Sequence, residues 1–298
     1  MKQSYDPRNA DIQVNIDGAL VHRDEAKVSV FDSLVQGGDG CWEGLRVYQG
    51  KVFRLDHHLD RLIHSAKALA FDEIPTKESM RAEIRRTLEA NGMDDGVHVR
   101  LTLSRGLKIT SGMDPRLNQA GPTLIVLAEY KAPVYDKQGL NLATSSLRRF
   151  PSDCLDPKIH HNNLLQSILA KVEANAAGAD DAIMLDMRGF VAETNATHLF
   201  MVDGGVLATS RTVACPEGVT RSTVLKLCRE HDIPHRVEDI SLTEFHRAEE
   251  VFCTGTMGEL AGVTRIDGRT IGDGEIGPLT QRLSSLYSEL TRQESEPV

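Results

Sequence analysis

The stretch from residue 155 to residue 200 constrains the fold most, because a loop, a helix and two strands follow one another within it. Helical periodicity runs from about 162 to 177 and stops at Gly178, a residue type that suits the turn after a helix. A short apolar strand follows over 181–186, and a tight Met-Arg-Gly turn leads into a second strand that carries Glu193. This order of elements indicates a fold that mixes helices and strands.

Two side chains of this stretch are candidates for chemistry. Lys158 lies in the loop before the helix, and Glu193 lies on the second strand. A helix–strand pair that brings them together would form a site with one amine nucleophile and one fixed negative charge. A loop lysine is more often a surface charge, so this interpretation requires an anion site elsewhere in the chain.

Patterns on either side of this stretch predict further strands and helices. Alternation and turn dipeptides predict strands over 12–16, 19–22, 28–31, 41–48, 51–53, 97–105, 123–130, 140–147, 199–202, 206–209 and 250–253. Capping or turn residues predict helices that begin near Asp56, Thr76, Gly218, Ser241 and Pro278. The run over 123–130 is apolar almost throughout, which predicts a strand buried on both faces.

The segment over 131–139, with sequence KAPVYDKQG, is the best candidate for a linker, because it holds proline, glycine and charge without periodicity. We therefore expect two α+β domains. One spans residues 1–130, and the other spans residues 140–298.

Composition excludes several classes of function. The net charge of −9 argues against a nucleic-acid surface, and the basic clusters at 81–86 and 148–149 read as solvated faces. Five scattered cysteines without a CxxC pair argue against disulfides and zinc, and adjacent histidines at 57–58 and 160–161 are a poor metal pattern. We find no apolar core of a signal peptide and no membrane span, so we expect a cytoplasmic protein.

Three features could bind an anion, although each also has an ordinary structural explanation. Val219 and Thr220 begin a predicted helix, where free amides and the helix dipole favour negative charge. Thr256 belongs to a Thr-Gly-Thr turn after a strand, which could form a nest of amides. Arg61 on an early helix offers a planar fork for two hydrogen bonds.

The order and spacing of these weak motifs resemble the class IV, or fold-type IV, pyridoxal-phosphate aminotransferases. The motifs are EGLRVYQGKVFRLDHHLDRL, VRLTLSRG, LDPKIHHNNLLQSILAKVEA, VAETNATHLF, GVTR and VFCTGTMGE. The resemblance covers residues 11–290. It implies a smaller N-terminal α/β sandwich, a larger C-terminal pseudo-barrel domain, pyridoxal 5'-phosphate as cofactor, and a homodimer with active sites near the subunit interface.

The resemblance also implies roles for individual residues. The positions that match the family's phosphate contacts are Arg61, Val219, Thr220 and Thr256. Glu193 would pair with the pyridine nitrogen and keep the ring protonated, so that the ring withdraws electrons. Lys158 would form the Schiff base and then act as base and acid.

The lysine position departs from the family pattern. Members of the family carry this lysine three or four residues before the asparagine that opens the helix. With Asn163 as that asparagine, His160 stands where a lysine is expected; with Asn162, Lys158 has a spacing of four. Two interpretations stay open: Lys158 reaches the cofactor through a shifted loop, or no lysine does.

The family's substrate-carboxylate pocket corresponds to a second set of positions, Arg100, His98, Arg46 and Trp42, in which His98 replaces the tyrosine of the branched-chain enzymes. Arg105 and Arg116 are alternative carboxylate binders, and Arg116 would match a loop arginine of the D-amino-acid enzymes. Arg46, in the EGLR motif, and Arg100 favour branched-chain-like amino acids.

The implied reaction is transamination between an amino acid and a 2-oxo acid such as 2-oxoglutarate, through an internal lysine imine. Three alternatives share the motifs. Two are related enzymes, an aminodeoxychorismate-type lyase and a transaminase for D-amino acids or amines. The third is a homologue of the same fold that lacks the imine lysine and does not use the cofactor covalently.

Overall fold

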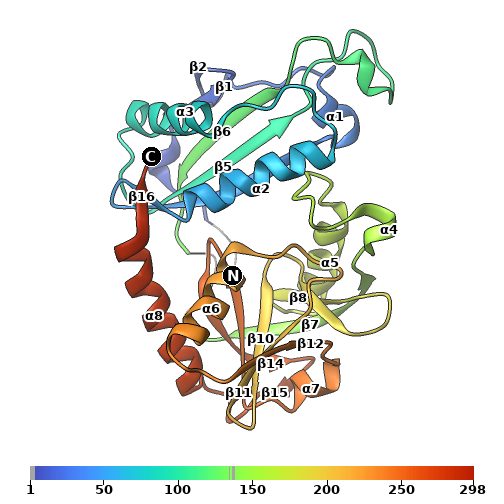
Figure 1. Ribbon diagram of the computed structural model, residues 1–298, viewed down its shortest axis with the longest axis vertical. Coiled ribbons are helices and arrows are strands. Elements are labelled where there is room, and N and C mark those ends of the chain that lie inside the picture. The colour runs from blue at the N-terminus through green and yellow to red at the C-terminus, as the bar shows by residue number, and fades with distance from the viewer. Residues whose placement is uncertain (1–3, 134, 136–137) are drawn as a thin grey trace. The chain divides into compact units, whose positions relative to one another are not determined.

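The computed structural model describes residues 4–133, 135 and 138–298, and both helices and strands are distributed along the chain (Figure 1). Contacts group the chain into two compact units. The N-terminal unit comprises Lys2–Ala132, Ile159–Asn163 and Thr291–Val298, and the C-terminal unit comprises Pro133–Lys158 and Leu164–Leu290. The α+β class expected from the sequence is confirmed. The predicted linker over 131–139 includes residues 134, 136 and 137, which lie outside the described residues.

The N-terminal unit is built on an antiparallel sheet in the order β16-β4-β3-β5-β6-β1-β2. Its strands are β1 (Gln13–Ile16), β2 (Ala19–His22), β3 (Gly40–Tyr48), β4 (Lys51–Phe53), β5 (Val97–Ser104), β6 (Thr123–Tyr130) and β16 (Ser295–Pro297). Helices α2 (Leu55–Ala68) and α3 (Lys77–Ala90) cover one face of this sheet (Figure 1). The helices bury Leu59, Leu62 and Ile84 against alternate residues of β3 and β5, including Leu45 and Leu101. Period-two alternation thus decides which face of each strand joins the core.

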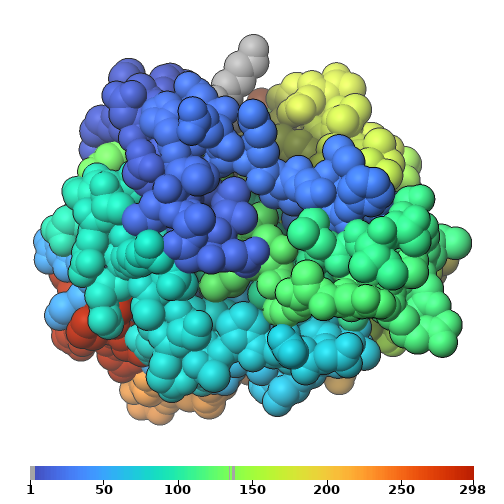
Figure 2. Space-filling model, turned by 90° about the horizontal axis from the view of Figure 1, so that it is seen from above, coloured from blue at the N-terminus to red at the C-terminus, as the bar shows by residue number. Residues whose placement is uncertain are grey.

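The strand predicted over 28–31 is wrong. Val30 is 70% exposed, and the segment forms isolated contacts instead of a strand ladder: the Lys108 amide donates to the Phe31 carbonyl at 3.0 Å, and Asp32 forms a bridge with Leu107. Asp32 instead caps α1 (Ser33–Gly37) by accepting a hydrogen bond from the Leu34 amide at 2.8 Å. Figure 2 shows this blue segment on the surface, beside the green loop that contains Leu107. An apolar run without a strand partner does not become a strand.

Three further expectations about this unit can be compared with the structure, and one of them is confirmed. Thr76 caps α3 as predicted and accepts a hydrogen bond from the Ser79 amide at 3.1 Å. Asp56 does not cap α2, because the helix begins one residue earlier, after Arg54 in the left-handed region. Strand β6 is buried on one face and half-exposed on the other, so the prediction that both of its faces are buried is wrong.

The C-terminal unit holds a second sheet, in the order β12-β11-β10-β13-β14-β7-β8-β9, with β15 paired to β14. Its strands are β7 (Leu140–Arg148), β8 (Asp181–Leu185), β9 (Val191–Thr194), β10 (His198–Asp203), β11 (Val206–Ser210), β12 (His235–Glu238), β13 (Glu250–Gly255), β14 (Glu259–Ile266) and β15 (Arg269–Thr270). Its helices are α4 (Ser152–Leu155), α5 (Leu165–Ala176), α6 (Val219–Glu230), α7 (Leu242–His246) and most of α8 (Pro278–Glu294).

Local signals set the helices of this unit. Helix α5 packs on β7 and β8, and it begins at Leu165 rather than at the predicted 162, because the Asn162 amide donates to the Gly40 carbonyl at 2.9 Å and residues 159–163 group with the N-terminal unit. The capping box predicted at Ser241 is confirmed, since Glu244 accepts hydrogen bonds from both the amide and the hydroxyl of Ser241 at 2.8 Å. Within the described part of the chain, no helix has the length and apolar character required to cross a membrane.

Candidate active site

A buried carboxylate and an arginine form the centre of the candidate site in the C-terminal unit. Glu193 on β9 is 3% exposed, and the guanidinium of Arg149, which follows β7, lies against its carboxylate. His198 at the start of β10 places Nδ1 4.0 Å from the other carboxylate oxygen. Burial lowers the pKa of Arg149 to about 10, and the charge of Cys215 partly opposes this shift. The contact with Arg149 therefore holds the Glu193 carboxylate in a fixed, buried position.

The N-terminus of α6 lies beside the same histidine. Gly218 precedes the helix with φ at 73°, and a Cβ atom at this position would overlap the His198 imidazole. The glycine is needed both for the left-handed backbone and for this close approach. No side chain caps α6, so its first amides, at Val219 and Thr220, are available to an anion at the positive end of the helix dipole.

The end of β13 completes this arrangement. His198 pairs with Thr254 across the sheet, and a Cβ atom on Gly255 would press against Thr197. Thr256 is the next residue along the chain. The C-terminal unit thus brings Glu193, the start of α6 and the end of β13 close to His198.

Lys158 lies in a turn at the edge of this unit. Its side chain is exposed, and its amide donates to Asp156 Oδ1 at 3.0 Å. Burial raises the pKa of the Cys215 thiol to about 11, while the charges of Arg221, Arg149 and Lys158 oppose that rise. The charge of Lys158 therefore acts on the same thiol, Cys215, as the charge of Arg149 does.

Arg61 belongs to the N-terminal unit, where its guanidinium is held by Glu43. Arg61 Nε donates to Glu43 Oε1 and Arg61 Nη2 donates to Glu43 Oε2, both at 2.7 Å. His58, one turn earlier on α2, places Nδ1 2.6 Å from Glu43 Oε2. Glu43 itself is completely buried. Burial disfavours the charged form of Glu43, but Arg61 and the histidines outweigh that effect and keep its pKa well below the ordinary value.

The predicted carboxylate binders share the other face of the same sheet. Cross-strand pairs place Gly44 opposite Arg100 and Arg46 opposite His98. Trp42 lies two residues before Gly44, so its ring projects on this face, and the Arg100 guanidinium carbon lies 4.0 Å from the ring centroid. This cation–π contact is the only side-chain partner of Arg100 in the described part of the chain. A half-buried arginine without a carboxylate is suited to bind one.

Arg46 and His98, the two other predicted carboxylate binders, are less suited than Arg100 to bind a carboxylate. Arg46 Nη1 donates to the Lys131 carbonyl at 3.1 Å, so part of its fork is engaged. Burial, followed by the charges of Lys131, Arg100 and Arg46, lowers the pKa of His98 to about 3. His98 is therefore a neutral ring that can donate or accept a hydrogen bond but adds no charge.

His160, at the alternative lysine position, is anchored in the N-terminal unit. Its amide donates to Ser65 Oγ at 3.0 Å, its Nδ1 contacts the Trp42 carbonyl, and its ring lies 4.5 Å from the Trp42 ring. Burial lowers the pKa of His160 to about 3. His160 is therefore a neutral side chain that is anchored through its amide, its Nδ1 and its ring contact with Trp42.

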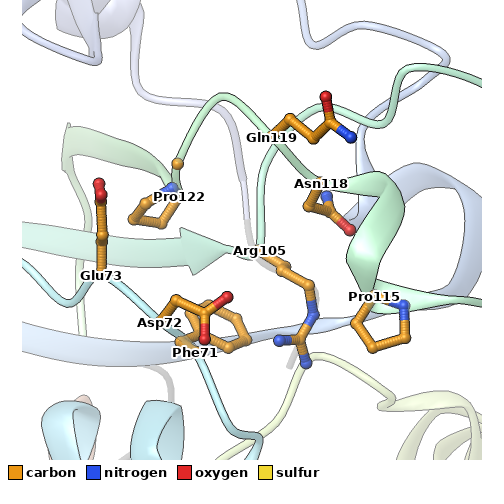
Figure 3. Close-up of a pocket in the computed structure, with 9 residues that line it drawn as sticks. Phe71, Asp72, Glu73, Arg105, Pro115, Asn118, Gln119 and Pro122 are labelled. Atoms are coloured by element: carbon orange, nitrogen blue, oxygen red, sulfur yellow. The ribbon is translucent and has the colours of Figure 1, made fainter.

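Arg105 and Arg116, the alternative carboxylate binders, each form an ion pair with an aspartate. Arg105 lines a pocket of about 130 Å³ in the N-terminal unit, shown in Figure 3 with Phe71 and Asn118. Its guanidinium forms two hydrogen bonds with Asp39, at 2.6 and 3.1 Å, and two more with carbonyls at the end of α2. Arg116 is highly exposed and pairs with Asp114 in its own turn. These contacts give both arginines structural roles.

Sequence reasoning overlooked two residues of the site. Arg149 was assigned to a solvated face, which is wrong for its side chain, and His198 was not singled out although it lies in the VAETNATHLF motif.

Among the described residues, no group of three or more histidine, cysteine or acidic side chains is arranged to hold a metal ion.

Comparisons with known proteins agree on one family. Residues 40–266 match the family model of the class IV amino-transferases. Branched-chain-amino-acid aminotransferase-like protein 2 of Arabidopsis thaliana is 54% identical over 293 residues, which are 98% of this chain and 52% of that protein. The chain therefore spans about half the length of this relative.

Two further proteins align with this chain over almost the full length of both sequences. A putative branched-chain-amino-acid aminotransferase of Methanocaldococcus jannaschii is 39% identical, over 94% of this chain and 96% of its own. The structure of a branched-chain aminotransferase from Thermoproteus uzoniensis, with norvaline, superposes with a TM-score of 0.89 at 32% identity and covers 95% of this chain and 96% of its own. Together with the match to the family model, these similarities show that the chain belongs to the class IV aminotransferase family.

Proposed function

We propose that the protein is a pyridoxal-phosphate-dependent aminotransferase that moves an amino group between an amino acid and a 2-oxo acid. The observation that carries this proposal is the buried Glu193 carboxylate, held beside Arg149 and close to the uncapped start of α6. A fixed anion near an anion-binding helix end suits a cofactor with a basic ring nitrogen and a phosphate.

The residues present fit this cofactor. The first amides of α6, at Val219 and Thr220, would bind the phosphate, with Thr256 close by in sequence to Thr254 at the end of β13. Arg61, in the N-terminal unit, is proposed as a separate candidate for binding a phosphate. Thr254 Oγ1 is buried without a hydrogen-bond partner among the described residues, which supports a polar ligand at this end of the sheet. Glu193 would accept a hydrogen bond from the ring nitrogen.

When bound, the cofactor supplies a protonated pyridine ring that withdraws electrons from the carbon bearing the amine. Glu193 holds the proton on the ring nitrogen, because a buried carboxylate next to a cationic ring favours the charged form of both. Arg149 holds the carboxylate in its ionised form and fixes its orientation. Loss of either residue would remove the negative charge or its position.

We propose Lys158 as the lysine that binds the cofactor and carries the proton at the amine-bearing carbon. Two observations support it: its charge acts on Cys215 together with that of Arg149, and His160, at the alternative position, is neutral and anchored to Ser65 and Trp42. Its exposed side chain, on a turn, can change rotamer at little cost.

We propose that the substrate carboxylate binds to Arg100, with Trp42 beside it. The arginine is half-buried, and a carboxylate would take the place of the missing counter-ion. Branched-chain-like L-amino acids are the favoured donors, with a 2-oxo acid such as 2-oxoglutarate as acceptor and a homodimer as the working form.

A panel of amino donors tests this proposal. Purified protein saturated with pyridoxal phosphate would be incubated with 2-oxoglutarate and with each L- or D-amino acid, and glutamate formation would be followed. We expect transfer from branched-chain L-amino acids. Absence of transfer from every donor contradicts the proposed function, and transfer from D-amino acids alone contradicts the substrate assignment.

A further inference from the structure

The pair of Glu43 and Arg61 has a geometry that a merely neutralising ion pair would not need. The two hydrogen bonds run from Nε and Nη2, so they fix both the plane and the rotation of the guanidinium. His58 Nδ1, at 2.6 Å from Oε2, acts as the third donor to the same carboxylate. Glu43 has no exposed surface, whereas the Arg61 side chain is 20% exposed.

The donor inventory of Arg61 leaves one edge available. A guanidinium carries five N–H groups, and Glu43 accepts from one on Nε and one on Nη2. Within the described part of the chain, Nη1 forms no hydrogen bond. The Arg61 side chain therefore turns its Nε–Nη2 edge into the protein, with two donors left on Nη1 and one on Nη2.

We propose that Glu43 is a positioning residue that holds Arg61 so that its Nη1 edge binds the phosphate monoester of the cofactor. This inference rests on the proposed function and extends it to a residue that never touches the cofactor. An arginine fixed before binding loses less side-chain freedom on binding, which strengthens the contact.

The proposal is testable because two roles of Glu43 predict opposite changes in phosphate affinity. If Glu43 positions Arg61, its replacement weakens phosphate binding; if Glu43 acts through its charge alone, its replacement strengthens binding. Glu43→Gln removes one negative charge beside Arg61, so electrostatics alone would strengthen binding of a phosphate. Glutamine also replaces one acceptor oxygen by an NH₂ donor, so it cannot accept both hydrogen bonds from Arg61. If positioning dominates, the same substitution weakens binding by about 3- to 10-fold, the cost of ordering one flexible side chain.

The probes are pyridoxamine phosphate, which has no aldehyde to react with lysine, and inorganic phosphate. Equilibrium dialysis would give the Kd for the first, and the shift in Tm would report the second. Glu43→Gln, Glu43→Asp and Arg61→Lys are each expected to raise the Kd and reduce the shift in Tm. Glu43→Asp keeps the charge but shortens the side chain, so it carries the test if Glu43→Gln does not fold.

A matched control is Glu294→Gln, which removes another carboxylate paired with an arginine, Arg54, at the start of α2. This variant is expected to keep the wild-type Kd. Equal or tighter binding by Glu43→Gln overturns the proposal, as does a wild-type protein that binds neither probe. The wild-type transfer assay separates the two claims: transfer with unchanged binding in Glu43→Gln refutes positioning alone, while weakened binding without any transfer refutes the proposed function alone.

Discussion

Arg149 lies against the carboxylate of Glu193, and the two residues are 44 positions apart in the sequence (193 − 149). The contact joins the end of β7 to β9 inside the C-terminal unit. A buried charge is tolerated only when it is paired, so each residue depends on the other for its ionised form. The proposed partner of the pyridine nitrogen is therefore held by a specific cation rather than by general polarity.

Replacement of Glu193 by glutamine should abolish most of the proposed activity. The neutral amide cannot stabilise a proton on the ring nitrogen, and it leaves Arg149 without its counter-charge. We expect kcat to fall by at least about 100-fold, the order of loss for a preorganised electrostatic group. Steady-state kinetics and the absorbance of the bound cofactor would measure it, and wild-type kcat in this variant would exclude a role for Glu193.

Replacement of Arg100 by alanine should weaken substrate binding more than turnover. A charge-assisted hydrogen bond contributes about 1.5–3 kcal/mol, so KM for both the amino acid and the 2-oxo acid should rise by roughly 10- to 100-fold. Arg116→Ala tests the alternative binder and should change KM little, because Arg116 is exposed and pairs with Asp114. The opposite pattern would assign the carboxylate to Arg116.

Gly218 and Gly204 form a matched pair in the C-terminal unit. Both have positive φ, but a Cβ atom at Gly218 would overlap His198, whereas nothing lies within 4 Å of one at Gly204. Gly204→Ala should cost only the backbone strain, about 1–2 kcal/mol of unfolding free energy. Gly218→Ala should also displace the start of α6 and weaken phosphate binding. Equal phosphate affinity in the two variants would contradict the anion site at α6.

His98 should make stability fall in mild acid. Burial lowers its pKa to about 3 in the folded protein, so between about pH 6.5 and pH 3 the unfolded chain binds a proton that the folded chain does not. Unfolding free energy should therefore decrease as pH falls, by about 2 kcal/mol between pH 7 and pH 5 for this residue.

Urea unfolding of His98→Gln at both pH values would measure this contribution. The variant should lose that part of the pH dependence, while His57→Gln, on the exposed surface of α2, controls for the loss of a histidine. An unchanged pH dependence in His98→Gln would show that His98 takes up its proton equally in both states.

The sequence alone predicts the features that depend on neighbours along the chain. The cap at Thr76, the capping box at Ser241 and the hairpins of the N-terminal unit are local signals, and all are present. The strand expected over 28–31 is absent because the segment forms isolated contacts, such as that of the Phe31 carbonyl with the Lys108 amide, and no ladder with a neighbouring strand among the described residues.

The candidate site was harder to predict because its contacts join distant segments. The motifs named Glu193, Val219 and Thr256, but they gave no sign that Arg149 is the cation beside Glu193 or that Glu43 holds Arg61. Basic residues next to one another look like a solvated face in a sequence. Only the folded chain shows which of them is buried against a carboxylate.

The lysine assignment is tested most directly by chemical labelling. Protein saturated with pyridoxal phosphate would be reduced with borohydride and digested, and the modified peptide would be identified by mass spectrometry, with Lys171 on α5 as the nearest alternative in sequence. We expect a phosphopyridoxyl group on Lys158. A label on another lysine, or a protein that binds the cofactor without any labelled lysine, would contradict the assignment.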